Sequence, residues 1–369
     1  MRLLLSLLST CLINAQAIQI VLKGNPKRTM DETGLVSALA KLKGKGGEVI
    51  IDGGQWLIRK EVRLSSNETI RGTNNTVLRL PGPRLVSGEA PIGAQTLSLD
   101  RVAEFAADGE LAVLPPGGGK ERITTVTVAS VAGRKLRLTK PLTKAIPANS
   151  RIGYSHRMFL GYAVSNVSLI NLQIDGGLDP AIPMPGHHLR SAIWISAPYN
   201  YEKGPTGKPA SNITVRNCTF TNCYGRAVAF YHTVDSSVID CRIGGLNDEA
   251  IDFDHFAFRC RAVGNEIDGA MIGVELNDAS DCEVLRNRIR NTHIGVRVWW
   301  YDKFDPAGLN TRNRIEGNTI SGVSRAAIHL GRNCLRNQVI NNKVQGKIDG
   351  DREVNQIDGN TWGATQRAP

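Results

Sequence analysis

Apart from its first residues, the sequence lacks any hydrophobic run long enough to span a membrane, and it lacks a Cys-x-x-C spacing. The first absence leaves no integral membrane segment in the mature chain, and the second gives no sign of a metal site built on paired cysteines. A motif of interleaved basic and aromatic residues is also missing, which argues against nucleic acid as a partner. The function is therefore expected on the surface of a folded chain.

The first residues have the features of a secretory signal peptide. Residues 1–17 contain a basic residue, Arg2, then an apolar run, and they end on the small-x-small sequence Ala15-Gln16-Ala17. The apolar run is too short to cross a bilayer, whereas this order of features is typical of a cleaved export signal. We expect the mature protein to be exported, to the periplasm or the extracellular space.

Basic residues outnumber acidic ones. The chain carries 45 Lys and Arg against 34 Asp and Glu, a formal net charge of +11. In an exported protein such a surplus suggests a polyanionic partner, such as an acidic polysaccharide or a cell surface. Because the basic residues are scattered rather than clustered, solubility alone is an equally good explanation.

One six-residue phrase recurs through the second half of the chain, with starts 23, 23 and 22 residues apart. Each copy alternates Val, Ile, Leu or Phe with small or polar residues, the pattern of a strand with one buried face. A fixed period just above twenty residues, with one such strand in each period, is typical of a solenoid. The copies read AVAFYH at 227–232, AIDFDH at 250–255, GVELND at 273–278 and GVRVWW at 295–300.

Stacking these phrases at the usual strand spacing predicts which side chains lie side by side. Val228, Ile251, Val274 and Val296 would form one inward ladder. The outward face would carry two columns of varied polar side chains, where function is expected. The first column reads Ala229, Asp252, Glu275 and Arg297, and the second reads Tyr231, Asp254, Asn277 and Trp299.

A second repeated slot, an Asn that follows a short strand, supports the same period. Asn265, Asn287, Asn318 and Asn342 occupy it in successive coils, where side-chain amides can bond one another along a turn. With the Gly-rich segment after a predicted helix over 31–42, this pattern resembles the pectin-lyase-like superfamily. The resemblance covers roughly residues 25–85 and 160–348.

The resemblance implies an all-β fold, a right-handed parallel β-helix, with an N-terminal capping helix. Residues 18–86 would form the cap and the first coils, and 156–369 the main β-helix. Residues 87–155 break the rhythm with short strands around a Pro- and Gly-rich turn, which predicts a small inserted antiparallel β subdomain. The superfamily includes polysaccharide lyases, glycosidases, uronan epimerases and non-catalytic adhesins, so the fold alone does not select a function.

The outward columns bring together acidic and amide side chains that could bind a cation. Asp252, Asp254, Glu275 and Asn277 offer oxygen ligands within reach of one another, as a Ca²⁺ site requires. The same carboxylates could instead be neutralised by Arg297 on the next coil. We expect either a working Ca²⁺ site or a structural ion-pair ladder.

These columns also hold groups suited to β-elimination on a uronate, which needs a cation at the carboxylate, a base and a proton donor. Arg297 or Ca²⁺ could supply the first, and His255 with Tyr231 the proton transfers. The predicted function is an exported enzyme that cleaves an acidic polysaccharide, most simply a lyase acting in a groove on the outer face of the β-helix.

Three alternatives remain open. Asp252 and Glu275, expected about 5 Å apart, could act as the carboxyl pair of a retaining glycosidase; the stretch 247–252 resembles a polygalacturonase phrase, although the next coils lack its partner motifs. The run 252–255 loosely resembles the signature of alginate C5-epimerases, in a different order and without its Pro. A non-catalytic carbohydrate-binding or adhesive β-helix would use the same groove.

Aromatic and histidine side chains on the outward face are the predicted sugar contacts, because flat apolar rings on an exposed face stack well on sugars. The predicted substrate-binding residues are Trp194, His232, Trp299, Trp300 and Tyr301.

Overall fold

The computed structural model describes residues 18–25, 27–101, 104–184, 191–300 and 310–363. The expected signal peptide, residues 1–17, and the expected sugar contact Tyr301 lie outside this part of the chain. No helix in the described part is long and apolar enough to cross a membrane.

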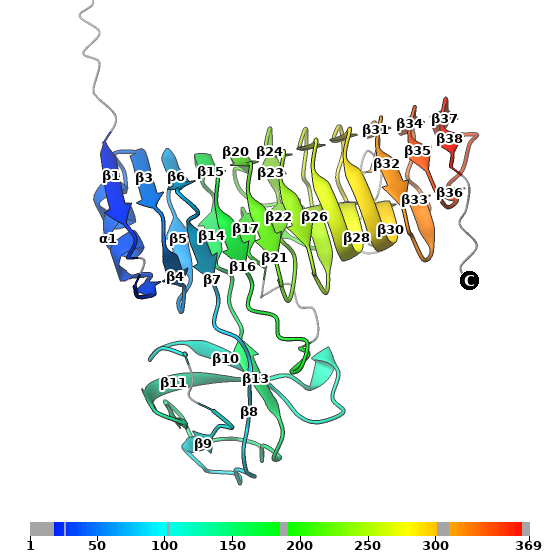
Figure 1. Cartoon of the computed structure of the whole chain (residues 1–369). Helices are drawn as coiled ribbons and strands as arrows, with labels where there is room; N and C mark the ends of the chain where they lie inside the picture. Colours follow the sequence, from blue (N-terminus) through cyan, green and yellow to red (C-terminus); the bar gives the residue numbers. More distant parts are fainter. Residues whose placement is uncertain (1–17, 26, 102–103, 185–190, 301–309, 364–369) are drawn as a thin grey trace, which may run out of the picture.

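The described chain winds into a right-handed parallel β-helix, which confirms the predicted fold class (Figure 1). One parallel sheet runs along its whole length and uses one short strand from each coil. In spatial order this sheet contains β1 (Gln19–Lys23), β3 (Gly47–Asp52), β6 (Glu68–Thr73), β15 (Ser165–Ile170), β20 (Ala210–Arg216), β24 (Ser237–Ile239), β27 (Arg261–Val263), β29 (Glu283–Leu285), β31 (Arg314–Glu316), β34 (Gln338–Ile340) and β37 (Gln356–Asp358), with β23 (Thr233–Val234) paired to β20.

The second sheet bends around a corner of the helix, because its two longest strands, β28 and β30, run through both of its arms. One arm stacks β2 (Met30–Asp31), β4 (Gln55–Leu57), β7 (Val77–Arg79), β16 (Gln173–Asp175), β21 (Thr219–Thr221), β25 (Arg242–Gly244), β28 (Glu266–Asn277), β30 (Arg288–Trp299), β32 (Thr319–Ser321), β35 (Lys343–Val344) and β38 (Thr361–Trp362). The other arm stacks β5 (Val62–Leu64), β14 (Phe159–Tyr162), β17 (Ile193–Ser196), β22 (Val228–Tyr231), β26 (Glu249–Asp254), the later halves of β28 and β30, β33 (Ala326–Leu330) and β36 (Ile348–Asp349).

The register of this second arm is the one that the repeated phrase predicts. Val228 pairs with Ile251, Ile251 with Val274, and Val274 with Val296. All of these ladder side chains are fully buried, and the rings of Phe230 and Phe253 in the next ladder stack with their centroids 5.6 Å apart. The apolar interior of the solenoid is therefore a set of columns, each filled by equivalent residues of successive coils.

The predicted asparagine column is present and its amides are hydrogen-bonded from coil to coil. Asn265 Nδ2 donates to Asn287 Oδ1 at 2.9 Å, and Asn287 Nδ2 donates to Asn318 Oδ1 at 3.0 Å. Each amide also binds backbone; Asn287 Oδ1, for example, accepts the Asn265 backbone N–H at 2.9 Å. Since buried amides must be paired, the column supplies hydrogen-bond partners for the backbone groups of the turns that leave the sheet.

The six cysteines that lie in the described part of the chain are free thiols, and all are buried. They occur in the interior columns as small apolar side chains, which is a common role of unpaired cysteine.

Two features lie at the early coils. Helix α1 (Thr33–Leu42) buries Leu35, Leu39 and Leu42 and packs against β1, β3 and β5 at the β1 end of the solenoid (Figure 1). The chain leaves the β-helix after β7, forms an antiparallel sheet, and re-enters the β-helix before β14. This sheet contains β8 (Arg84–Leu85), β13 (Arg151–Tyr154), β10 (Glu110–Leu114), β11 (Thr124–Ala132), β12 (Lys135–Leu138) and β9 (Thr96–Ser98).

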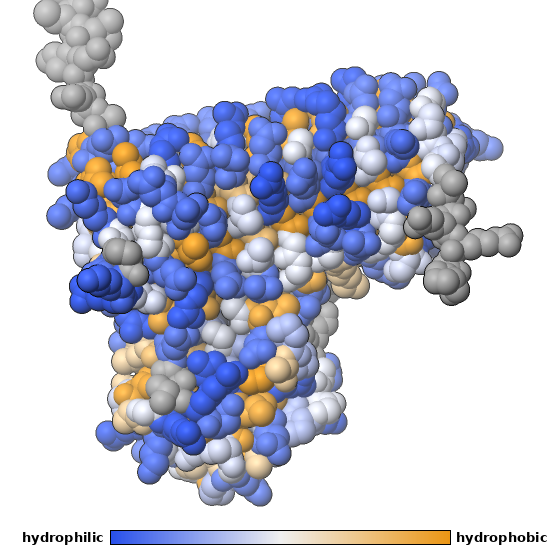
Figure 2. Space-filling view, viewed as in Figure 1, coloured by the Kyte–Doolittle hydropathy of each residue, from blue (hydrophilic) through white to orange (hydrophobic). Residues whose placement is uncertain are grey.

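The short helix η1 (Lys120–Arg122) lies within the same insertion, and the hairpin strands β18 (Tyr199–Asn200) and β19 (Gly204–Pro205) belong to a separate loop after β17. The view in Figure 2 shows a solenoid surface that is largely hydrophilic, with hydrophobic residues scattered between. That surface suits a chain surrounded by water.

Replacing Asn287 by Ala should lower the free energy of unfolding by about 2–4 kcal/mol, because it leaves buried amide and backbone groups unpaired. Chemical denaturation measures the change. Asn247→Ala is the control, since this exposed side chain donates a hydrogen bond to Met184 O, and its loss should cost about 1 kcal/mol or less. Equal losses in the two variants would show that the column adds nothing specific.

Candidate functional site

The outward columns have the predicted register. Asp252 lies beside Glu275, Glu275 beside Arg297, and Asp254 beside Asn277. Their exposure differs from that of an open groove: Asp252 is 0% exposed and Glu275 2% exposed. The middle of the outward face is therefore covered, and neither carboxyl of the expected glycosidase pair is open to solvent.

Two arginines enclose the buried carboxylates. Arg226 Nε lies 2.8 Å from a carboxylate oxygen of both Glu249 and Asp252. At the other end, Arg297 Nη2 lies 2.5 Å from Glu275 Oε1 and 3.8 Å from Glu249 Oε1. The arrangement is the self-neutralising ladder that the sequence left open as one possibility, with a second arginine added to it.

The ladder holds more carboxylates than guanidinium groups, and this excess changes their protonation. Burial, with the charges of Glu249 and Asp252, raises the pKa of Glu275 well above its usual range, despite the nearby Arg297. For Glu249, burial is outweighed by Arg226 and by a hydrogen bond from Glu275, and the pKa falls to about 2. These directions favour a proton on Glu275 beside an ionised Glu249.

A second group of polar side chains lies where the strands of this arm end. His255 Nδ1 is 3.2 Å from Asp254 Oδ1 and 3.2 Å from Asp278 Oδ2. The Tyr231 hydroxyl is hydrogen-bonded to Asp254, and burial raises the pKa of both groups. Within the described residues, Asp254, His255 and Asp278 form the cluster that could hold a metal ion. The predicted Ca²⁺ set was Asp252, Asp254, Glu275 and Asn277, which shares only Asp254 with this cluster.

Two of the predicted sugar contacts lie under other side chains. The Trp194 ring stacks on Tyr231 with centroids 4.4 Å apart, and Arg157 lies over its other face at 4.8 Å, so that Trp194 is 7% exposed. His232 is buried as well and binds Pro198 O through Nδ1 at 2.8 Å. In this conformation both side chains are part of the layer that buries the middle of the outward face, and neither is open to a sugar.

The outward face becomes open towards its C-terminal end, where a cleft of about 690 Å³ lies beside β30 and β33. Trp299 and Trp300, two of the predicted sugar contacts, line it together with Arg325, His329 and Arg332. Arg297 approaches this cleft, since its guanidinium lies 5.6 Å from the centre of the Trp299 ring and its strand position pairs with His329. Aromatic and cationic side chains thus meet in one open place.

His329 is the titratable group of this cleft. Its Nδ1 lies 3.2 Å from Asp349 Oδ2, and Lys347 Nζ lies 3.1 Å from the same oxygen. Burial lowers the pKa of His329, which the neighbouring Asp349 opposes and Arg325 and Arg297 assist. With Nδ1–H donated to Asp349, Nε2 keeps its lone pair and can accept a proton.

Five polar residues of these groups were not predicted from the sequence: Arg226, Glu249, Asp278, His329 and Asp349. His329 could have been found, because the phrase AIHLG at 327–331 continues the repeat and places it next to Arg297. Arg226 and Glu249 precede the repeated phrase, and Asp278 is the last residue of its phrase, in a turn with a φ of 51°. Strand alternation does not give the direction of these side chains.

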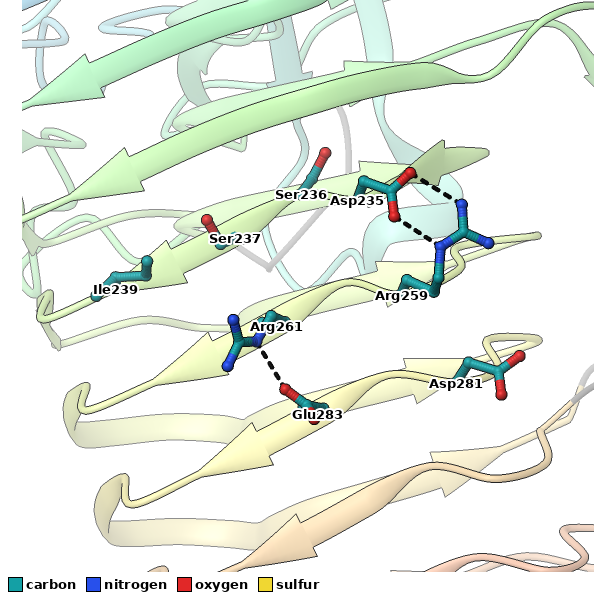
Figure 3. A pocket seen from close by; sticks show the side chains of 8 residues that line it. All are labelled: Asp235, Ser236, Ser237, Ile239, Arg259, Arg261, Asp281 and Glu283. Atoms are coloured by element: carbon teal, nitrogen blue, oxygen red, sulfur yellow. Dashed lines mark hydrogen bonds and ion pairs between the residues drawn. The ribbon is translucent and has the colours of Figure 1, made fainter.

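A charged depression also lies over β24, β27 and β29, on a different sheet of the solenoid, as Figure 3 shows. Its arginines are paired across coils: Arg259 Nε with Asp235 Oδ1 at 2.6 Å and Arg261 Nε with Glu283 Oε2 at 2.7 Å. Because each of these charges already has an opposite partner, this depression offers less to a charged ligand than the C-terminal cleft.

Residues 196–368 match the family model described as periplasmic copper-binding protein (NosD), which covers slightly less than half of the chain. A comparison with the curated proteins finds no match.

Among solved structures, the chain is similar to polygalacturonase from Erwinia carotovora ssp. carotovora, with 11% identity, a TM-score of 0.42 and 95% of each chain covered. An exopolygalacturonase from Thermotoga maritima has 12% identity and a TM-score of 0.42, with 90% of this chain and 82% of that one covered. The tailspike of E. coli bacteriophage HK620, in complex with a pentasaccharide, has 14% identity and a TM-score of 0.46, with 93% of this chain and 64% of that one covered.

Replacing Glu275 by Gln should reduce the loss of stability at rising pH. A raised pKa means that the folded chain keeps a proton which the unfolded chain releases above about pH 4.5, so this group destabilises the fold as pH rises towards the folded pKa. The neutral amide has no proton to lose. Urea unfolding of both proteins from pH 4 to pH 8 measures the two slopes, and parallel slopes would contradict the shared proton.

Proposed function

We propose that this chain, a right-handed parallel β-helix protein of the pectin-lyase-like superfamily, is an exported enzyme that cleaves a uronate-containing polysaccharide by β-elimination. The observation that carries the proposal is the open C-terminal cleft, where two tryptophans, several arginines and the His329–Asp349 pair meet. An export route is supported by the predicted signal peptide and by the periplasmic description of the matching family.

Each step of the elimination has a candidate group in this cleft. Arg325 and Arg332, both exposed, with Arg297 beside them, can bind the uronate carboxylate and stabilise the negative charge that develops when C5 loses its proton. Neutral His329 can take that proton at Nε2, because Asp349 holds the other ring nitrogen. Breaking the C4–O4 bond then leaves a C4–C5 double bond, and the imidazolium can return its proton to O4 where both lie on one face of the ring.

The tryptophans suit an extended sugar chain. Trp299 is 40% exposed beside this cleft, so that its ring can stack on a pyranose. Trp300 Nε1 is buried and has no hydrogen-bond partner among the described residues, and it could donate to a sugar oxygen. These two residues keep the role that the sequence assigned to them.

The roles predicted from the sequence for the middle of the outward face require a conformation in which the side chains that bury it move away. Asp252 and Glu275 could act as a glycosidase pair, and His255 and Tyr231 as proton-transfer groups, in a conformation that exposes them. A Ca²⁺ ion held by Asp252, Asp254, Glu275 and Asn277 stays a prediction with the same requirement. The C-terminal cleft is favoured because it needs no rearrangement.

Incubation with alginate, pectate, glycosaminoglycans and neutral glycans tests the activity. We expect an acidic glycan to give both new reducing ends and the absorbance of the unsaturated uronate. New reducing ends without the absorbance of the unsaturated uronate would favour the glycosidase. No product from any glycan, with glycan binding retained, would favour the binding module.

Variants locate the active residues once a substrate is found. His329→Gln should lower kcat by about 10²–10⁴-fold with a small change in KM, as expected for a general base, and Trp299→Ala should mainly raise KM, by about tenfold, through lost stacking. Arg259→Gln, in the charged depression of the other sheet, is the control and should retain wild-type kinetics. A His329→Gln enzyme with full activity would remove this cleft from the mechanism.

The pH profile gives an independent check. A base works in its neutral form, so activity should fall as pH drops through the pKa of His329, which lies below the ordinary 6.5. The acid limb of kcat/KM should therefore have its midpoint below about pH 6.5, and it should disappear in any residual activity of His329→Gln. A midpoint well above 6.5 would assign the proton transfer to a different group.

A further inference from the structure

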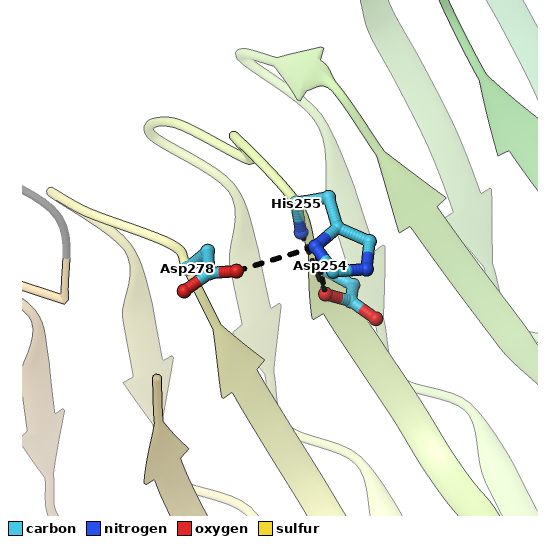
Figure 4. Close-up of side chains that lie close together, drawn as sticks. All are labelled: Asp254, His255 and Asp278. Atoms are coloured by element: carbon cyan, nitrogen blue, oxygen red, sulfur yellow. Dashed lines mark hydrogen bonds and ion pairs between the residues drawn. The ribbon is translucent and has the colours of Figure 1, made fainter. Parts of the chain in front are cut away.

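Asp254, His255 and Asp278 lie apart from the C-terminal cleft and are not used by the proposed elimination. Asp254 ends β26, His255 follows it, and Asp278 is the first residue after β28. Figure 4 shows both carboxylates turned towards the same edge of the imidazole ring. All three residues are buried, with exposures of 3%, 5% and 0%.

Their donor atoms have the spacing of ligands around a small cation. His255 Nδ1 is 3.2 Å from one oxygen of each aspartate, and the three atoms all lie within 4.8 Å of one another. Two donors that lie about 2.1 Å from one ion and 3.2 Å from each other subtend about 100° at that ion, near the tetrahedral angle. The two histidine–aspartate separations therefore match those of ligands that share one ion.

The three side chains are buried beside aromatic rings, so charge there requires compensation. The rings of Tyr201, Tyr231 and Tyr199 approach His255 with centroid distances of 4.7, 5.3 and 5.4 Å. Two carboxylates taken from water into such a setting repel each other unless positive charge lies between them. A protonated imidazole would supply one charge, and a divalent cation bound by a neutral imidazole would supply two.

Two further observations favour a bound ion. The side-chain oxygen of Asn277, directly beside Asp254 in the strand register, is buried and accepts no hydrogen bond from the described residues. It offers an additional oxygen donor close to the cluster. Tyr231, which is not a member of the cluster, is hydrogen-bonded to Asp254. Carboxylates that bind a metal are commonly oriented by such hydrogen bonds.

The donor set also selects the kind of ion. Ca²⁺ takes oxygen ligands at 2.3–2.6 Å and six to eight of them, whereas a histidine nitrogen with carboxylates suits Zn²⁺ and other first-row divalent ions. We propose that Asp254, His255 and Asp278 form a binding site for a first-row divalent cation, best matched by Zn²⁺. The proposal is independent of the elimination at the C-terminal cleft.

Metal analysis of the full chain is the first test. Protein loaded with Zn²⁺ and dialysed should retain about one ion per chain. The midpoint of thermal unfolding, Tm, should rise by about 4 °C at a Zn²⁺ concentration one hundred times its Kd. A chelator should reverse the shift. The proposal would be overturned if the protein retained no metal and showed no shift with Zn²⁺, Mn²⁺ or Cu²⁺. A stronger response to Ca²⁺ would overturn the choice of ion.

Matched variants assign the site. His255→Asn and Asp278→Asn should each weaken Zn²⁺ binding at least tenfold, and Asn suits their backbone because both residues have positive φ, 36° and 51°. His232→Asn is the control: it occupies the same turn position one coil earlier, with φ 46°, and binds Pro198 O. Retained Zn²⁺ affinity in both site variants, or an equal loss in the control, would place the ion elsewhere, and the wild-type titration decides the question if a variant does not fold.

Discussion

The hydrogen-bonded stacking of equivalent strands is the constraint on which the rest of this structure depends. Each coil must place its strand in register with the next, so a side chain has the equivalent residue of the neighbouring coil as its closest cross-strand partner. Inside the solenoid this produces apolar ladders and an amide column. Outside it produces columns in which any charge lies about 5 Å from whatever the next coil carries.

That constraint explains why the acidic column is bounded by arginines. Asp252 beside Glu275 would be unfavourable alone, since like charges repel at this spacing. Arg226 pairs with Asp252 at one end and Arg297 with Glu275 at the other, and burial with the neighbouring carboxylates raises the pKa of Glu275 despite Arg297. Such a network supports a defined register, because a coil shifted by one residue would turn these groups into the apolar interior.

The sequence predicts the periodic part of the structure well and the covered part poorly. The register of the phrases, the inward Val and Ile ladder and the asparagine column follow from a period and an alternation, and all three are confirmed. Burial of the outward column does not follow, because it depends on aromatic residues such as Tyr199 that reach across from a loop outside the repeat. Asp278 and Asp349 were missed for a related reason: one lies in a turn, and the other in a coil shorter than the period.

The position of the cleft follows from where this cover stops. Along one outward column the residues change from Asp252 and Glu275, which are buried, to Arg297 and His329, which are partly exposed. The charge of a buried carboxylate ladder is neutralised by its own arginines, so it is not available to bind a ligand. An arginine at the margin, held by Glu275 on one side and open towards Trp299 on the other, is oriented before any ligand arrives, so less rotamer entropy is lost on binding an anionic sugar. The buried ladder thus contributes to recognition by fixing the cationic group at its edge.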